Sequence, residues 1–231
     1  MSFWQILKQD FTEPLRQDPA CNGVFEIFFC YPGVWALINY RFAHFFYERG
    51  FKLIARAISG LTRIITAVDI NPGAKIGSGV FFDHATGLVI GETVIIGDNC
   101  LIYQGVTLGG VSLEHGKRHP TLQNGVVVGA GAKVLGNITI GENSKIGANS
   151  VVIKDVEPNC TAVGVPARIL GSCESDPLAH NKIPDISQEL IKYLIKRIEI
   201  LEDCICSGRK DIAAMDEDLN KFYEEYLKSL K

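Results

Sequence analysis

The chain has 231 residues, 47% of them apolar, and its 23 basic and 26 acidic side chains leave a formal net charge of −3. A chain of this length can bury a substantial core without disulfide or metal staples, which excludes a disordered chain, a collagen and a small disulfide scaffold. The absence of net positive charge gives no support to binding of nucleic acid or of an anionic membrane.

Cysteine spacing and the N-terminal residues favour a reducing, intracellular setting. The seven cysteines are scattered, and the one close pair, Cys204 and Cys206, has neither redox nor zinc spacing. We therefore expect free thiols, no metal site and a cytoplasmic protein. Charged residues interrupt the first 15 positions, so no secretion signal is expected. The most apolar window, 24–46, is broken by two charges and a proline, which excludes a membrane span.

Residues 1–68 have the spacing of helices. A set of apolar residues falls on one helical face, and the pair Pro32-Gly33 interrupts the chain just before it. The set consists of Val34, Leu37, Ile38, Phe42, Phe45 and Phe46. We predict an N-terminal helical domain over 1–68.

Residues 69–172 have a different composition, because they hold 18 of the 23 glycines. An aliphatic residue or Phe recurs there every six positions, usually followed by a small or polar residue. These residues are Ile70, Ile76 and Phe82, then Ile90, Ile96, Ile102 and Leu108, then Val128, Val134, Ile140, Ile146 and Val152. A period of six is typical of a parallel β-helix, in which three short strands form one coil of about 18 residues. We predict four to five coils between Ile70 and Pro166.

Two breaks interrupt this period. The step from Phe82 to Ile90 is eight residues, and the step from Leu108 to Val128 is 20. The segment 110–124 is polar and rich in glycine, so we predict a loop extruded from the coils. Loops on repeat scaffolds are where function is usually located.

Residues 173–231 lose the six-residue period. Pro177 and Pro184 mark a linker, and apolar residues from Ile191 to Ile205 fall on heptad positions. Two heptads leave open a short coiled coil or a helix packed on its own subunit or on a neighbour. We predict a linker and a C-terminal helical extension over 173–231.

Candidate chemistry lies where polar residues break the period, because the interior of the coils is apolar. Asp83 and His84 lie on the first break, and Arg118 and His119 lie in the predicted loop. Asp69 precedes His84 by 15 residues, which can place the two on adjacent coils of about 18 residues. A carboxylate there would hold one imidazole nitrogen and leave the other free as a general base. A surface or capping pair is the alternative explanation of the same spacing.

Several motifs occur in one order along the chain. They are DPAC at 18–21, VDINPGAKIG at 68–77, FDHATGLVIGE at 82–92, VTLGG at 106–110, RHP at 118–120, VGAGAKVLG at 128–136 and GVPAR at 164–168. Together they resemble serine O-acetyltransferase, a family of hexapeptide-repeat acyltransferases. The resemblance covers about residues 18–171 and implies a left-handed β-helix. It also implies transfer of the acetyl group of acetyl-CoA to the hydroxyl of L-serine, the first step of cysteine synthesis.

The resemblance implies roles for individual residues. His84 matches the family's general base, and Asp69 matches the carboxylate that orients it. The remaining matches concern the zwitterionic substrate: Arg118 and His119 on the side of its carboxylate, Asp18 and Asp83 on the side of its ammonium group. A guanidinium suits a carboxylate because its paired donors match the two oxygens.

The coenzyme is expected along the outside of the coils. Gly110, Ala130 and Ala148 match positions where the family contacts CoA through the backbone. Lys145 is a candidate for a CoA phosphate, and Lys133 and Arg168 are weaker candidates. Each of these cations could equally be a solvated surface residue.

The family also implies a homotrimer with its sites between subunits, or a dimer of trimers. About 68 residues precede the repeats, so both states stay open. Many members end in an isoleucine that binds O-acetylserine sulfhydrylase, but this chain ends Ser229-Leu230-Lys231 and we do not expect that partner. The alternatives are another acceptor, homoserine or an amino sugar, and a non-catalytic hexapeptide protein that binds a partner.

Overall fold

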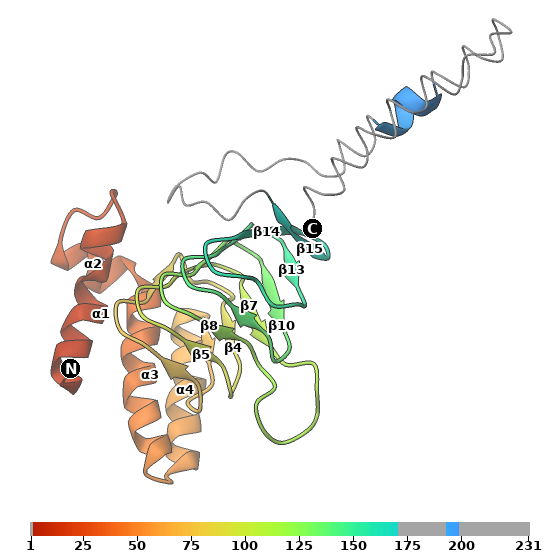
Figure 1. The fold of residues 1–231 in the computed structure, drawn as a ribbon. Coiled ribbons are helices and arrows are strands. Elements are labelled where there is room, and N and C mark those ends of the chain that lie inside the picture. The colour runs from red at the N-terminus through yellow and green to blue at the C-terminus, as the bar shows by residue number, and fades with distance from the viewer. Residues whose placement is uncertain (1, 171–192, 199–231) are drawn as a thin grey trace, which may run out of the picture. The chain divides into compact units, whose positions relative to one another are not determined.

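The computed structural model describes residues 2–170 and 193–198 (Figure 1). The described residues fall into two units, and each is treated by itself. Residues 2–168 belong to the first, and residues 169, 170 and 193–198 to the second. In the second unit, Arg197 Nη1 donates to Tyr193 Oη at 2.7 Å. Of the predicted heptad positions in the C-terminal extension, only Leu194 and Ile198 are among the described residues. The remaining heptad positions and residues 229–231 lie outside them.

Four helices precede the strands: α1 (Phe3–Gln17), α2 (Val24–Cys30), α3 (Pro32–Glu48) and α4 (Lys52–Thr66). Ser2 and Gln5 form a capping box at the start of α1. The start of α3 is a proline, whose missing N–H costs nothing in the first helical turn.

The apolar face predicted for α3 is only partly buried. Val34 and Leu37 lie in the core, whereas Phe42 and Phe45 are 38% and 40% exposed and instead pack edge-on or tilted against Phe3 of α1. The neighbouring face of the helix is buried as well, and it carries Arg41, which makes the polar contacts described below. No helix in the described ranges is long and apolar enough to cross a membrane.

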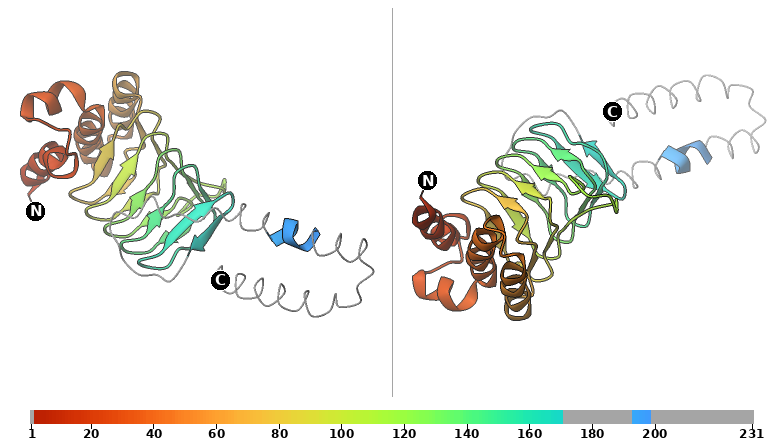
Figure 2. Two further views of the ribbon diagram at one scale, coloured as in Figure 1. Left: turned by 90° about the horizontal axis from the view of Figure 1, so that it is seen from above. Right: turned by 90° about the horizontal axis from the view of Figure 1, so that it is seen from below.

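Short strands form three sheets that face one another (Figure 2). The interior that they enclose is apolar. Sheet A contains β1 (Asp69–Ile70), β4 (Val89–Ile90), β7 (Thr107–Gly109), β10 (Lys133–Leu135) and β13 (Val151–Val152). Sheet B contains β2 (Lys75–Ile76), β5 (Ile95–Ile96), β8 (Thr121–Leu122) and β11 (Thr139–Ile140). Sheet C contains β3 (Phe81–Asp83), β6 (Leu101–Tyr103), β9 (Val127–Val128), β12 (Lys145–Ile146), β14 (Thr161–Gly164) and β15 (Ala167–Leu170).

The six-residue period creates the core of this parallel β-helix. Ile90, Ile96, Ile102 and Leu108 point inward and are at most 2% exposed, and each such burial stabilises the fold by about 1.5–3 kcal/mol. Strands one coil apart pair in parallel, as Ile90 does with Leu108. The predicted helices followed by stacked coils are thereby confirmed.

Both predicted breaks lengthen a coil at one place. Ile76 pairs with Ile96, 20 residues on, and Ile96 pairs with Leu122, 26 residues on. The first addition lies at His84, and the second is the extruded loop. The predicted loop 110–124 extended too far, because Thr121 and Leu122 form β8. Leu122 lies six residues before Val128 and is 1% exposed, so it belongs to the repeat.

Close backbone contact and a buried ion pair fix the helices on the first coil. Gly33 packs its Cα against the carbonyl of Phe82, where a Cβ would not fit. Arg41 binds Asp10 of α1 through Nε at 2.8 Å and donates to the carbonyls of Ile76 and Gly77, each at 2.5 Å. Removing one partner of such a pair typically costs about 3–5 kcal/mol. The helices therefore hold a fixed position beside β3.

The expectation of free thiols is met at three of the described cysteines and corrected at a fourth. Cys21, Cys30 and Cys100 are free. Cys160 is disulfide-bonded. Spacing alone did not indicate this bond, since the chain has no paired cysteine motif.

Candidate functional site

The polar residues of interest gather at two corners of the coils, on opposite edges of sheet A. The chain turns from sheet C into sheet A after Asp83, and from sheet A into sheet B after Ile90. We name the first the acidic corner, formed by Asp18, Tyr31, Asp83, His84 and Tyr103. We name the second the arginine corner, formed by Tyr47, Glu92, Thr93, Arg118 and His119.

The acidic corner presents an exposed histidine in an unusual backbone conformation. His84 and Ala85 have φ angles of 55° and 57°, in the left-handed region that such residues rarely adopt. Two tight hydrogen bonds close the turn, from Ala85 N to Asp83 O at 2.6 Å and from Thr86 N to His84 O at 2.7 Å. Backbone strain of this kind is found most often at functional sites. The turn also accounts for the two extra residues of this coil.

Two carboxylates surround His84. Asp18 lies just after α1, where its side chain accepts from Tyr31 Oη at 2.5 Å and from Ala20 N at 2.8 Å. The Tyr31 hydrogen bond lowers the pKa of Asp18, with smaller contributions from Ala20 and from the nearby His84. Burial raises the pKa of Asp83, which also feels the charge of Asp18. The corner therefore combines two acids of different proton affinity around one imidazole.

Asp69 lies on the coil next to His84, as the spacing predicts. Gly87 N donates to Ala67 O and Asp69 N donates to Leu88 O, each at 2.9 Å, so the turn after His84 stacks on the segment that carries Asp69. The Asp69 carboxylate pairs with Arg63 Nη1 at 3.2 Å, and the described residues contain no hydrogen bond between Asp69 and His84. The Arg63 pair is well exposed, and pairs of that kind are worth about 0–1 kcal/mol.

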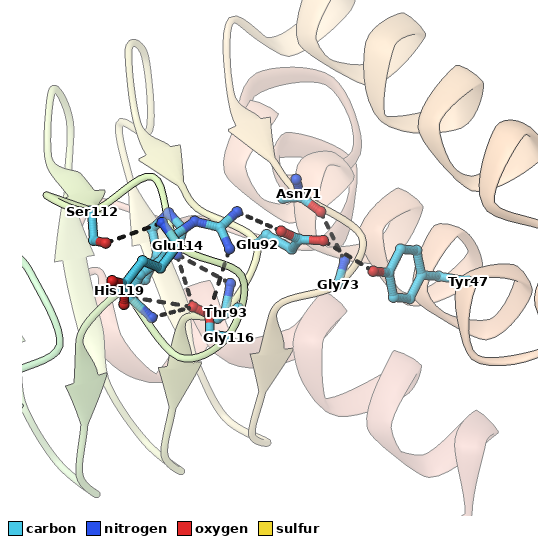
Figure 3. Close-up of polar contacts among 10 residues, drawn as sticks. Tyr47, Asn71, Gly73, Glu92, Thr93, Ser112, Glu114, Gly116 and His119 are labelled. Atoms are coloured by element: carbon cyan, nitrogen blue, oxygen red, sulfur yellow. Dashed lines mark hydrogen bonds and ion pairs between the residues drawn. The ribbon is translucent and has the colours of Figure 1, made fainter.

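The arginine corner is densely hydrogen-bonded (Figure 3). Arg118 Nη2 pairs with Glu92 Oε2 at 2.6 Å, and Tyr47 Oη donates to Glu92 Oε1 at 3.2 Å. The Arg118 hydrogen bond is the main reason that the pKa of Glu92 is lowered. The end of α3, the turn after β4 and the extruded loop thus meet at one carboxylate.

Lys117 fixes the end of the loop at this corner. Its Nζ donates to the carbonyl oxygens of Thr93, His119 and Pro120 at 2.8, 2.5 and 3.0 Å. Beside it lies a cavity of about 430 Å³ whose walls include Tyr47, Lys75, Glu92 and Arg118. The cavity has room for a small polar molecule next to the guanidinium.

His119 is enclosed by two glycines and a threonine. It is 8% exposed, and its ring lies against Gly91 and Gly110, where a Cβ on Gly91 would overlap it. Its Nδ1 is 2.8 Å from Thr93 Oγ1 and 3.3 Å from Thr93 N. Burial lowers the pKa of His119, and the neighbouring Arg118 and Lys117 lower it further.

The coenzyme candidates lie at both corners. Ala130 and Ala148 stack on the edge that carries His84, since Asn149 N donates to Ala130 O at 2.8 Å. Gly110 lies at the other edge, against Arg118 and His119. Lys145 is on β12 and partly buried, and Lys133 Nζ donates to the carbonyl of Gly105.

One chain therefore brings the predicted residues together in two groups. Asp18, Asp83 and His84 form one group with Asp69 on the adjacent coil, and Arg118 and His119 form the other. Sequence reasoning missed Glu92 and Thr93. Both lie in the motif 82–92 or next to it, but a glutamate and a threonine in a turn carry no spacing signal.

Comparison with known proteins gives the same family at the level of sequence, repeat and fold. Residues 119–154 match the family model "Bacterial transferase hexapeptide (six repeats)". A curated serine acetyltransferase of Synechococcus elongatus is 52% identical over 202 residues, which cover 87% of this chain and 83% of the relative.

Solved structures extend the likeness to ligand complexes. A serine acetyltransferase of Brucella abortus in complex with coenzyme A is 44% identical, with a TM-score of 0.70 over 73% of this chain and 68% of the other. A serine acetyltransferase of Neisseria gonorrhoeae in complex with serine is 43% identical, with a TM-score of 0.69 over 72% and 68%.

These matches remove one of the alternatives left open by the sequence. The expected fold class, an N-terminal helical region followed by a left-handed parallel β-helix, is confirmed, and a non-catalytic hexapeptide protein is set aside because the relatives are enzymes. With this identity over most of both proteins, the chain belongs to the serine acetyltransferase family of hexapeptide-repeat acyltransferases.

Proposed function

We propose that this enzyme transfers the acetyl group of acetyl-CoA to the hydroxyl of L-serine, forming O-acetyl-L-serine and CoA. The observation that carries the proposal is the pair of corners, which offers a histidine between carboxylates at one edge of sheet A and an arginine at the other. A zwitterionic amino acid needs both signs of charge in its site. A sugar acceptor would not use them.

His84 acts as the general base in this proposal. A serine hydroxyl is a weak nucleophile at neutral pH, so the base removes its proton while the oxygen attacks the thioester carbonyl. The tetrahedral intermediate then collapses and the C–S bond breaks. The imidazolium gives the proton that it took from serine to the departing CoA thiolate. No acyl-enzyme is required.

Asp69 orients His84 and stabilises the imidazolium that forms. Two observations support this role of Asp69. The turn that carries His84 stacks on residues 67–69, and the ion pair of Arg63 with the Asp69 carboxylate is exposed and weak, so the carboxylate can change partner. A carboxylate in this role fixes which ring nitrogen is free.

The substrate is held by its two charges. Arg118 and His119 bind the carboxylate of serine, and Asp18 and Asp83 face its ammonium group. Arg118 donates to Glu92 through Nη2 and to the carbonyl of Gly116 through Nη1 at 3.4 Å, and its remaining N–H groups are left for the substrate.

The complete site requires a neighbouring copy, because the two corners lie on opposite edges of sheet A. We propose a homotrimer in which the acidic corner of one copy meets the arginine corner of the next. Either a trimer or a dimer of trimers satisfies this arrangement. CoA would then lie along the same groove, contacting backbone at Gly110, Ala130 and Ala148 and placing a phosphate near Lys145.

An acceptor series tests the proposed function. CoA release from acetyl-CoA is measured with L-serine, L-homoserine and glucosamine at equal concentrations. We expect a kcat/KM for serine at least tenfold above the others, since a site built for one polar substrate rejects analogues that leave its groups unpaired. Equal rates with all three acceptors would refute the choice of serine.

A further inference from the structure

The hydrogen bonds around His119 fix the position of its proton. Thr93 N is a backbone amide and can only donate, and it donates to Nδ1 at 3.3 Å. An Nδ1 that accepts carries no hydrogen, so a neutral His119 has its proton on Nε2.

The Thr93 hydroxyl reinforces this assignment. Thr93 Oγ1 accepts from Arg118 N at 3.1 Å and from His119 N at 3.2 Å. Its two lone pairs are thereby occupied, and its own hydrogen is left to donate to Nδ1 at 2.8 Å. One threonine thus holds the loop backbone at two successive residues and the imidazole at a third point.

The charges around the ring favour the neutral form. Arg118 and Lys117 of the loop are positive, while Glu92 of the neighbouring turn is already paired with Arg118. A second proton on Nδ1 would point at the Thr93 N–H. The imidazole is therefore a neutral group beside a cationic one.

The Nε2–H is the free end of this arrangement. No hydrogen bond between described residues uses Nε2. The fully buried side-chain atoms without a partner in the described ranges are Gln9 Oε1, Ser59 Oγ and Gln104 Oε1, so His119 Nε2 is not among them, and the residue is 8% exposed. It lies against Gly91 and Gly110, where an added Cβ would be 2.2 Å and 3.2 Å from it.

We infer that Thr93 is a positioning residue that locks His119 as an Nε2–H donor for the carboxylate of the amino-acid substrate. The inference rests on the proposed function for the identity of the acceptor, but the position of the proton does not. Arg118 supplies the charge, and His119 supplies a directed neutral donor. In this arrangement the Nε2–H of His119 donates to one carboxylate oxygen of the substrate, and His119 takes no part in proton transfer.

Two measurements test the inference separately. Two-bond ¹H–¹⁵N correlation spectra of the full chain report which ring nitrogen is protonated, with the His119 signals assigned by their loss in His119→Gln. We expect Nε2–H in the wild type. Thr93→Val keeps only the longer 3.3 Å hydrogen bond from the amide of residue 93, so a measurable minority of Nδ1–H should appear in that variant. Nδ1–H in the wild type would overturn the inference, whatever the enzyme's substrate is.

Steady-state kinetics give the second readout. Thr93→Val should raise the KM for serine up to about tenfold, because a misdirected His119 loses its one neutral hydrogen bond to the substrate, with kcat and the KM for acetyl-CoA within twofold. Thr93→Ser should restore both serine KM and tautomer, and Thr139→Val, an exposed threonine on β11, should change neither. An unchanged serine KM in Thr93→Val with an unchanged tautomer would also overturn it. A wild type inactive on serine would refute the proposed function, while the spectra would still decide the tautomer.

Discussion

The two edges of sheet A hold their histidines in opposite ways. His119 is buried, its Nδ1 has two partners from Thr93, and its pKa is lowered. His84 is exposed in a left-handed turn, and no ring hydrogen bond to it occurs within the described part of the chain. The first imidazole is organised by its own chain and is suited to binding. The second is exposed and has no ring hydrogen bond among the described residues, so a substrate hydroxyl can reach it, as a base requires.

The two corners also differ in how many of their hydrogen-bond partners come from the same chain. The arginine corner is complete in one chain, with Lys117 and Thr93 tying the loop to the turn after β4. The acidic corner has two carboxylates of unlike pKa and an unengaged imidazole. Substrate and a neighbouring copy would supply the missing partners there.

Removing the free imidazole should have the largest effect. His84→Asn keeps a residue that tolerates positive φ, so it deletes the base without adding backbone strain. We expect kcat to fall by about 10²–10⁴, with the KM for acetyl-CoA within twofold. Steady-state CoA release measures both constants, and a kcat within threefold of the wild type would show that His84 is not the base.

Disturbing the organised imidazole should cost less. In Gly91→Ala the new Cβ overlaps the ring of His119 and displaces it. We expect kcat/KM for serine to fall by about 10², the usual effect of a displacement near 1 Å.

Gly60→Ala is the matched control for this variant. Gly60 lies in α4 with nothing near its absent Cβ, so alanine there should leave the kinetics unchanged and raise stability by up to about 1 kcal/mol. Equal kinetic losses in both variants would contradict a local role for Gly91.

The arginine corner should distinguish charge from geometry. Arg118→Lys keeps the positive charge but loses the planar fork that binds Glu92 and, in our proposal, the substrate. We expect the KM for serine to rise about tenfold while kcat changes by less than threefold. An unchanged KM for serine would remove Arg118 from the carboxylate site.

The smallest effect concerns stability and pH at Glu92. Its pKa is lowered chiefly by Arg118, so the native state binds this proton less tightly than the unfolded chain. The stabilisation is full above the usual value of 4.5 and is lost as pH falls through the lowered pKa. Since the side chain is 38% exposed, Glu92→Gln should cost less than about 1 kcal/mol at pH 7. Urea unfolding should show this gap closing in acid, and a gap that widens would contradict the assignment.

Most of the fold could be predicted because the period of six encodes it directly. Ile90, Ile96 and Ile102 mark inward positions that any coil of this type must bury. The error at Leu122 arose because polar neighbours hid one repeat position. On α3, the apolar pattern gave only part of the buried face: Arg41 is buried there because it pairs with Asp10, 31 residues away, and no local pattern shows such a partner.

The candidate site was predictable where polar residues break the six-residue period and where a motif names a residue. Spacing placed Asp69 beside the turn of His84, because coil length is fixed. Nothing in the sequence placed Thr93 under His119, since their contact depends on how the extruded loop folds back across 26 residues. The sequence also did not show that the Asp69 carboxylate forms an ion pair with Arg63 of the same chain.

The extruded loop has a consequence for how such enzymes diversify. Gly110 to Pro120 leave sheet A and rejoin the stack at β8, and Ile96 pairs with Leu122 as though no residues had been added. The pairing of the strands on either side is therefore independent of the segment inserted at this point. Exchanging residues 111–120 between homologues should therefore change the preferred acceptor while the stacked coils stay as they are.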